Sequence, residues 1–267
     1  MAEAVSSGRA RAAVLALALL AAGAGPAAAQ GWPFMFTVTT ESGGPETSWT
    51  AHYEGGYAER APDPFAFDGM EHRLGVQGRL GHGLTLRGQA GLGIADDRSA
   101  RTTEEIEVLK DLRAPTRGVG LALGLGVRRE WRGATVLLGR IAAGHSFRHS
   151  SLFGNLRFER PLAPGRDAID LLTTLGWRRR FGAVHVGVEA VGEDLEGFWE
   201  AEEAEGGAKL FVGPSLQLAP AGRAWSATVC GGPILYATRS GRASPADRPL
   251  ESTGNGYTMR FAVSYSF

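Results

Sequence analysis

Cysteine is almost absent from the 267-residue sequence, and long apolar runs are absent beyond the first thirty residues. The single cysteine, Cys230, excludes an internal disulfide and a cysteine-cluster metal site. A helical membrane span needs roughly 20 apolar residues, and no window after residue 30 supplies them. Net charge is lacking too, because 28 basic side chains balance 28 acidic ones. Such a chain has no overall field that attracts nucleic acid, so we expect no nucleic-acid partner.

Complete catalytic and metal-binding motifs are also missing. The six histidines form no H-E-x-x-H or similar ligand spacing. Gly144-His145-Ser146 looks like the start of a G-x-S-x-G nucleophile elbow, but Arg148 stands where the second glycine is required. A dyad of Ser146 with a neighbouring histidine is the one enzymatic alternative, a lipid hydrolase. We therefore predict that the protein is not an enzyme and has no catalytic residue, metal site or cofactor.

An acidic segment runs from Glu193 to Glu205 and holds seven carboxylates. Oxygen-rich clusters of this kind can bind Ca²⁺ or Mg²⁺. The segment lacks the D-x-[DN]-x-[DN]-G order of an EF-hand loop, however. Its simplest interpretation is a solvated loop, with cation binding as the alternative.

The first thirty residues have the features of a secretory signal peptide. Arg9 and Arg11 precede an Ala/Leu-rich run over residues 12–22, and the small residues Ala27-Ala28-Ala29 follow it. A basic start, an apolar middle and an A-x-A site are the three parts of such a peptide. An uncleaved anchor is the alternative, although the apolar run is short for a membrane span. We predict a signal peptide over residues 1–29 and a mature chain that begins near Gln30.

Beyond residue 30 the sequence alternates between apolar and polar residues in segments of about ten. The last segment shows this best, because one face carries Tyr257, Met259, Phe261, Val263, Tyr265 and Phe267. Side chains alternate between the two faces of a strand, so this pattern predicts a strand with one apolar face. A soluble β-sandwich would turn that face inward, whereas a membrane barrel would turn it toward lipid. The segment length and the C-terminal aromatic residue favour the barrel.

Connections of two lengths separate these segments. Gly81-His82-Gly83 is a tight turn, whereas residues 194–206 form a long polar connection. Short periplasmic turns and long outer loops alternate in this way in outer-membrane barrels. We predict an all-β, antiparallel, up-and-down transmembrane β-barrel over residues 46–267, preceded by an N-terminal extension over residues 30–45. Twelve strands are expected to start near residues 47, 69, 84, 105, 118, 134, 154, 168, 183, 207, 223 and 256. Ten strands are the alternative, because the segments near Ile106 and Leu156 alternate weakly.

The final strand resembles the sorting signal of bacterial outer-membrane proteins, with Phe261, Tyr265 and Phe267 as its aromatic residues. The strings 194–198 and 211–215 are similar to those of an uncharacterised proteobacterial family of outer-membrane barrels, a resemblance that carries no activity. The resemblance implies location in the outer membrane of a Gram-negative bacterium. It also implies contact with outer-membrane lipid and lipopolysaccharide. The barrel-assembly machinery and periplasmic chaperones are implied as partners during biogenesis.

Charged side chains gather on the face that is predicted to line the lumen. The candidates are Arg73, Arg79, Arg87, Asp170, Arg178, Glu189 and Arg260, accompanied by Glu71, Arg128, Arg140 and Lys209. Charges inside a pore select the solutes that pass, which predicts a passive, porin-like channel for small solutes. The same residues could instead cross-link a closed structural or adhesive barrel through ion pairs. Glycines on this face remove side-chain volume and favour open space, although glycine also suits the curvature of a small barrel.

The predicted lumen is uneven in charge. Arg79 and Arg87 flank the tight turn at residues 81–83, on the same face of adjacent strands. Arg178 and Arg260 lie on strands that run toward the same end. The lumen should therefore be more positive near its periplasmic mouth than near the acidic loop. If the barrel is open, this gradient predicts a weak preference for anionic solutes at the inner constriction.

Overall fold

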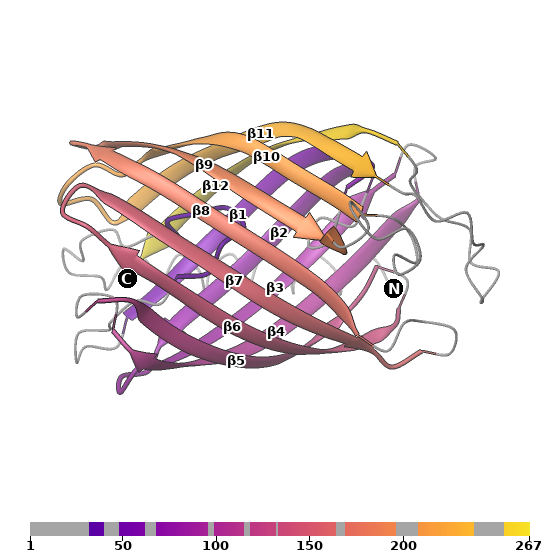
Figure 1. The fold of residues 1–267 in the computed structure, drawn as a ribbon, viewed down its shortest axis with the longest axis horizontal. Coiled ribbons are helices and arrows are strands. Elements are labelled where there is room, and N and C mark those ends of the chain that lie inside the picture. Colours follow the sequence, from indigo (N-terminus) through magenta and orange to yellow (C-terminus); the bar gives the residue numbers. More distant parts are fainter. Residues whose placement is uncertain are drawn as a thin grey trace, which may run out of the picture.

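The structure is a computed structural model that describes residues 32–39, 48–61, 68–95, 99–114, 118–131, 133–163, 169–195, 208–237 and 254–267. Twelve antiparallel strands form a closed barrel in which each strand pairs with its neighbours in sequence and the last pairs with the first (Figure 1). The strands are β1 (Ser48–Glu59), β2 (Gly69–Arg79), β3 (Leu84–Ile94), β4 (Ala100–Arg113), β5 (Gly120–Arg129), β6 (Thr135–Ser146), β7 (Ser150–Pro161), β8 (Asp170–Phe181), β9 (Val184–Glu193), β10 (Ala208–Leu218), β11 (Trp225–Ala237) and β12 (Gly256–Ser266). The predicted fold and the count of twelve strands are confirmed, and the ten-strand alternative is wrong. Within the described ranges no helix is long and apolar enough to cross a membrane.

The two segments that alternate weakly in the sequence are full strands. On β4, Glu105 and Glu107 are buried while Ile106 between them is exposed. On β7, Arg157 and Glu159 are buried while Phe158 is exposed. Burial thus alternates regularly along both strands, whereas the hydrophobic contrast is blurred by polar residues toward the strand ends. The sequence pattern is weak there because exposed charges interrupt the outward faces, Glu104 and Lys110 on β4 and Arg160 on β7, and because Phe153 of β7 faces inward.

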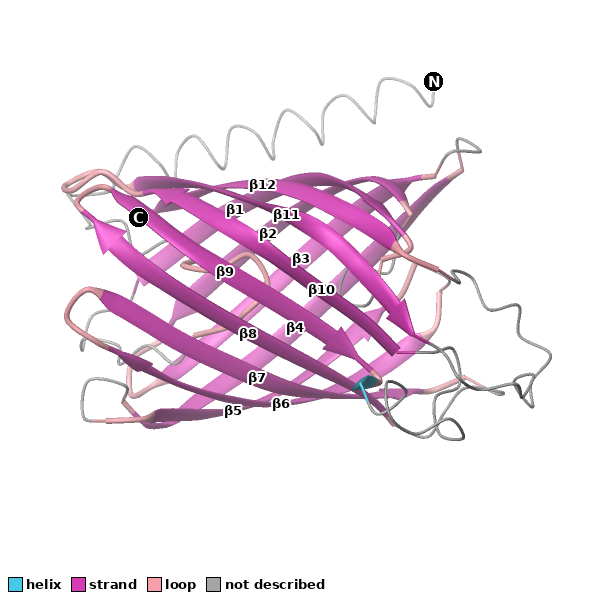
Figure 2. Ribbon diagram, turned by 45° about the horizontal axis from the view of Figure 1, so that its top comes forward, coloured by secondary structure: helices cyan, strands magenta, loops and turns pink. Residues whose placement is uncertain are grey.

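The outward face of the wall is apolar. Leu125 on β5 is 75% exposed, and Leu74 on β2 and Met259 on β12 are 63% exposed each. These side chains alternate with buried ones along strands that run obliquely around the barrel (Figure 2). Large apolar side chains on the outside and polar ones inside are the pattern of a barrel that has lipid as its solvent.

The end of the barrel that holds Phe267 carries the short connections and is called the turn end here. At the β2–β3 turn, Leu84 donates its backbone N–H to Gly81 O over 2.9 Å. The turn places Gly81, His82 and Gly83 at positive φ, which glycine adopts without strain and which the histidine tolerates in a tight turn. The opposite end is called the loop end. Large parts of the connections at the loop end lie outside the described residues, among them residues 196–207 of the predicted acidic loop.

A charge placed on the outward face should destabilise the barrel strongly. Leu123 lies in the middle of β5 and is exposed on that face. Leu123→Arg should lower the free energy of unfolding by about 2–4 kcal/mol, because the guanidinium must leave water for lipid. Urea titration of the barrel in phospholipid vesicles measures this, with Leu123→Met as the matched control. A Leu123→Arg barrel as stable as the Met variant would contradict a lipid-facing position.

Candidate functional site: a charged lumen and its N-terminal segment

The candidate lumen residues differ in burial. Arg73, Glu189 and Arg260 are buried, and Arg79, Arg87, Asp170 and Arg178 are partly buried. They do not converge on a single site. Some belong to two separate ion-pair clusters on the inner wall, and Arg87, Arg178 and Glu189 contact a segment of the chain that lies inside the barrel.

The residues of the proposed sorting signal lie apart from this interior. Phe261 is exposed on the outward face of β12, and Tyr265 and Phe267 are partly exposed. Phe267 donates its backbone N–H to Trp49 O over 2.9 Å and accepts one from Trp49 N over 3.1 Å. These two bonds extend the seam between the last strand and β1 to the final residue of the chain.

The first ion-pair cluster joins the strands on both sides of that seam. Arg260 of β12 donates to Glu54 Oε1 of β1 and to Glu71 Oε2 of β2, each over 2.5 Å. Arg73 donates to the other oxygen of Glu71. Two arginines and two glutamates therefore neutralise one another in a region where all four are buried. Such pairs fix side chains in place, because separating them would leave an uncompensated buried charge.

The second cluster spans five neighbouring strands, β3 to β7. It consists of Arg87, Glu105, Glu107, Arg128, Arg140, Arg157 and Glu159. Glu107 accepts from Arg140 over 2.5 Å and from Arg87 over 3.1 Å. Arg157 donates to Glu105 over 2.8 Å. Several of the arginines predicted from the sequence to line a pore are thus paired with carboxylates of neighbouring strands.

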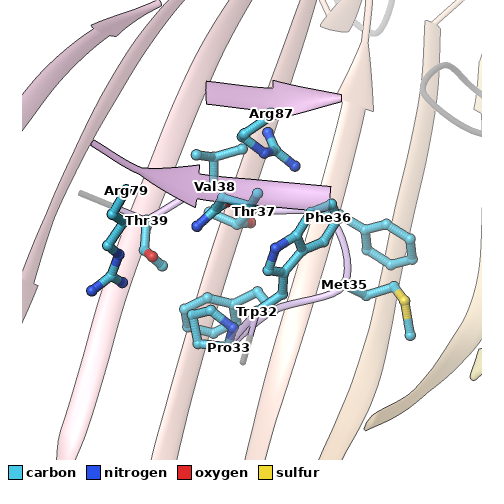
Figure 3. Close-up of a pocket in the computed structure, with 11 residues that line it drawn as sticks. Trp32, Pro33, Met35, Phe36, Thr37, Val38, Thr39, Arg79 and Arg87 are labelled. Atoms are coloured by element: carbon cyan, nitrogen blue, oxygen red, sulfur yellow. The ribbon is translucent and has the colours of Figure 1, made fainter. Parts of the chain in front are cut away.

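Residues 32–39 lie inside the barrel, against its inner wall (Figures 1 and 3). Glu189 on β9 accepts the backbone N–H groups of Met35 and Phe36, over 3.0 and 2.9 Å. Asn155 on β7 forms two bonds with the backbone of Val38: its Oδ1 accepts from Val38 N and its Nδ2 donates to Val38 O, both over 2.8 Å. The segment is therefore held by side chains of the wall and is not a strand of it.

The carbonyl groups at the start of the segment are bound as well. Gln217 of β10 donates to Trp32 O over 3.0 Å, and Arg178 of β8 donates to Pro33 O over 3.4 Å. Gln217 also accepts from Arg178 over 2.7 Å. Four adjacent strands, β7 to β10, thus each contribute a side chain that binds the backbone of this segment.

The aromatic side chains of the segment contact rings and cations of the wall. Trp32 stacks on His52 of β1, with ring centroids 4.0 Å apart, and the Arg87 guanidinium lies 4.6 Å from the centre of the indole. Phe34 packs against Phe153 of β7 at 6.2 Å, and the Arg178 guanidinium lies 5.4 Å from the Phe34 ring. Such stacked and cation–π contacts add to the stabilisation that burial of a ring gives.

The middle of the segment lies against an apolar part of the inner wall. Phe36 meets Phe211 of β10 edge-on at 5.3 Å. Met35 and Phe36 belong to a buried apolar cluster with Ala58, Ala61, Leu172, Val191, Phe211, Cys230, Ile234 and Ala262. The two ion-pair clusters lie on β12 and on β1 to β7. The large side chains of the apolar cluster lie on β8 to β11 and are called the apolar wall here.

The inward glycines do not leave open space at the segment. A Cβ on Gly176 would lie 2.6 Å from Phe34 Cδ1, and one on Gly75 would lie 3.3 Å from Trp32 Cη2. The volume that these glycines free is used by aromatic rings of residues 32–39. The interpretation of inward glycines as open lumen is therefore wrong at Gly75 and Gly176. One pocket beside the segment is lined by residues 32–39 together with Gln77, Arg79 and Arg87 (Figure 3).

The other chemistry considered from the sequence has little structural support. His145 beside Ser146 has its Nδ1 2.7 Å from Gly118 O at the turn end. The described residues contain no group of three His, Cys, Asp or Glu side chains placed to hold a metal ion. At the loop end, Lys209 Nζ lies 3.9 Å from Glu193 Oε2, and most of the acidic loop is outside the described residues.

Several members of these interactions were not predicted from the sequence. They are Glu54, Glu105, Glu107, Asn155, Arg157, Glu159 and Gln217, and the position of residues 32–39 in the lumen was not predicted either. A signal was present for the charged residues, since Glu105 alternates with Glu107 and Arg157 alternates with Glu159. Charges two residues apart on a strand share a face, so both pairs could have been assigned to the inner wall.

Several solved porin structures have a similar architecture. A KdgM porin superposes with a TM-score of 0.56 at 11% sequence identity, covering 82% of this chain and 99% of the porin. A structure of KdgM porin in complex with disordered oligogalacturonate gives 0.55 at 13% identity, covering 82% and 99%. A NanC porin gives 0.55 at 10% identity, covering 80% of this chain and 98% of the porin. No protein-family model and no curated sequence matches the chain. At these identities the likeness establishes the fold alone: the chain is a closed twelve-stranded barrel that superposes on these porins.

Proposed function

We propose that the protein is a porin-like channel for small solutes in the outer membrane of a Gram-negative bacterium, and that residues 32–39 narrow its lumen. The observation that carries the proposal is that residues 32–39 are not part of the barrel wall. The twelve strands close without residues 32–39, which are attached to the wall by side chains and ring contacts. Removing such a segment leaves a complete barrel with a charged interior, as a solute channel requires. The porin fold supports the same conclusion.

We propose that solutes pass beside the segment, on the side of β2 and β3. Gln77, Arg79 and Arg87 of these strands line the pocket that adjoins the segment there. Arg87 is balanced in part by Glu107 at 3.1 Å. We propose that the two arginines give this passage a weak preference for anions, because a fixed positive charge lowers the barrier for an anion and raises it for a cation.

Conductance across a planar bilayer tests the channel. Replacing residues 32–39 by a Gly/Ser sequence of equal length should raise the single-channel conductance severalfold, with a reversal potential that shows weak anion preference in a salt gradient. The wild-type protein should carry a small current or none. Equal, large conductance in both proteins would show that the segment does not narrow the lumen.

A closed barrel is the second candidate, and the two buried ion-pair clusters favour it. Both clusters cross-link neighbouring strands through the interior. If neither the wild-type protein nor the Gly/Ser variant conducts, although both are shown to be inserted, the channel is refuted. The closed structural barrel would then be the better account.

The proposed sorting signal can be separated from the backbone seam that it extends. Phe267→Ala keeps the two backbone bonds to Trp49 but removes the ring. We expect a severalfold lower yield of heat-modifiable folded protein in outer-membrane fractions, whereas Phe267→Tyr should stay near the wild type. Wild-type yield for the alanine variant would contradict a role of the ring in assembly.

A further inference from the structure

The inner wall binds the main chain of residues 32–38. Six hydrogen bonds between described residues join the wall to the segment. They involve the N–H groups of residues 35, 36 and 38 and the carbonyl groups of residues 32, 33 and 38. In contrast, Trp32 Nε1 and Thr37 Oγ1 are buried without a hydrogen-bond partner in the described part of the chain. The polar recognition is therefore directed at the peptide backbone, which every peptide has, and not at these polar side chains.

Glu189 and Asn155 are suited to a peptide. Glu189 is 0% exposed, and its two carboxylate oxygens accept two successive backbone N–H groups. Asn155 presents one acceptor and one donor to a single residue, which is the pairing that a neighbouring strand would offer. A sugar hydroxyl or an inorganic ion does not supply alternating N–H and C=O groups at this spacing. The chemistry of the two side chains therefore indicates a peptide ligand.

The ring contacts add a preference for aromatic residues. Trp32, Phe34 and Phe36 each meet a different ring of the wall, on β1, β7 and β10. Gly75 and Gly176 provide the room for two of these side chains. The wall thus combines backbone recognition with three places that accept aromatic rings.

We propose that the lumen is a binding site for short peptides rich in aromatic residues, and that residues 32–38 occupy it as an internal ligand. A peptide of the same chemistry from outside the chain binds there when the segment is displaced. The inference rests on the proposed function in one respect, since the segment must be able to leave the lumen. It deepens that function by naming the class of solute that the interior recognises.

The test is peptide binding to the detergent-solubilised Gly/Ser variant by isothermal titration calorimetry. The probe is a synthetic peptide with the sequence of residues 31–40, acetylated and amidated at its ends. We expect saturable 1:1 binding that weakens about tenfold in the Asn155→Ala background, which loses the two hydrogen bonds to the peptide as well as the one from Arg140. Thr103→Ala is the matched control, because it removes a lumen hydroxyl that donates to Arg129 O and should leave binding unchanged. A peptide with its three aromatic residues changed to serine should bind much more weakly.

A second variant guards against misfolding of the first. Changing Met35 and Phe36 to serine weakens the seat of the segment on the apolar wall and leaves the chain length unchanged. If neither variant binds the peptide, although circular dichroism and heat-modifiability show that both are folded, the inference is overturned. Because calorimetry needs no current, conductance without binding would refute the peptide site alone. Binding without conductance would refute the channel alone.

Discussion

Replacing Arg260 by alanine should lower the free energy of unfolding by about 3–5 kcal/mol, the effect of breaking a buried ion pair by removing one partner. Arg260 is 1% exposed and donates to two glutamates on two other strands. Its loss would leave Glu54 without its closest cation and Glu71 with Arg73 alone. Because β12 and β1 form the seam of the barrel, the variant should also open at this seam first.

The control for this prediction is the removal of an arginine whose side chain is exposed. Arg180 is exposed near the turn end of β8, so Arg180→Ala should change stability by no more than about 0.5 kcal/mol. Urea titration in phospholipid vesicles gives both values. Adding Glu54→Gln and Glu71→Gln to Arg260→Ala should recover part of the loss, since no carboxylate then remains unpaired in the cluster. Equal stability of the Arg260 and Arg180 variants would show that the cluster contributes nothing to the fold.

The wall of the barrel could be predicted from the sequence because its outward face meets lipid and its inward face is polar. Lipid requires apolar side chains on every second residue, and the outward faces of β3, β5 and β12 satisfy that rule almost without exception. The tight turn at Gly81-His82-Gly83 and the long connections then fix the order of strands. Only β4 and β7 were doubtful, because each also carries charged side chains on its outward face.

The pairing of the inner charges could not be predicted in the same way. Alternation places Arg260 and Glu71 on the inward face, but it does not say which strands bring them together. Glu71 is on β2 and Arg260 on β12, separated by β1, so their 2.5 Å contact depends on the closure of the barrel and on the stagger of three strands. Alternation within each strand contains no direct signal for a contact between side chains of different strands.

The position of residues 32–39 was hidden for a different reason. The segment has no strand periodicity, and it precedes β1 like an ordinary extension. The places of its aromatic rings depend on Gly75 and Gly176, which make room for Trp32 and Phe34 and lie on strands far from the segment in the sequence. Glycine on an inward face is compatible with an empty lumen and with a filled one, and only the structure decides between the two.

The accessibility of Met35 to a water-soluble thiol reagent tests the seating of residues 32–39 most directly. In a Cys230→Ala background, which removes the native thiol, Met35→Cys should react about a hundredfold more slowly than Ala221→Cys in the exposed β10–β11 turn. That ratio corresponds to a local opening free energy of roughly 3 kcal/mol. Met35 is buried against the apolar wall and its N–H is bound by Glu189, so Glu189→Ala should remove much of the protection. Reaction of Met35→Cys at the rate of the turn cysteine would contradict a segment held inside the barrel.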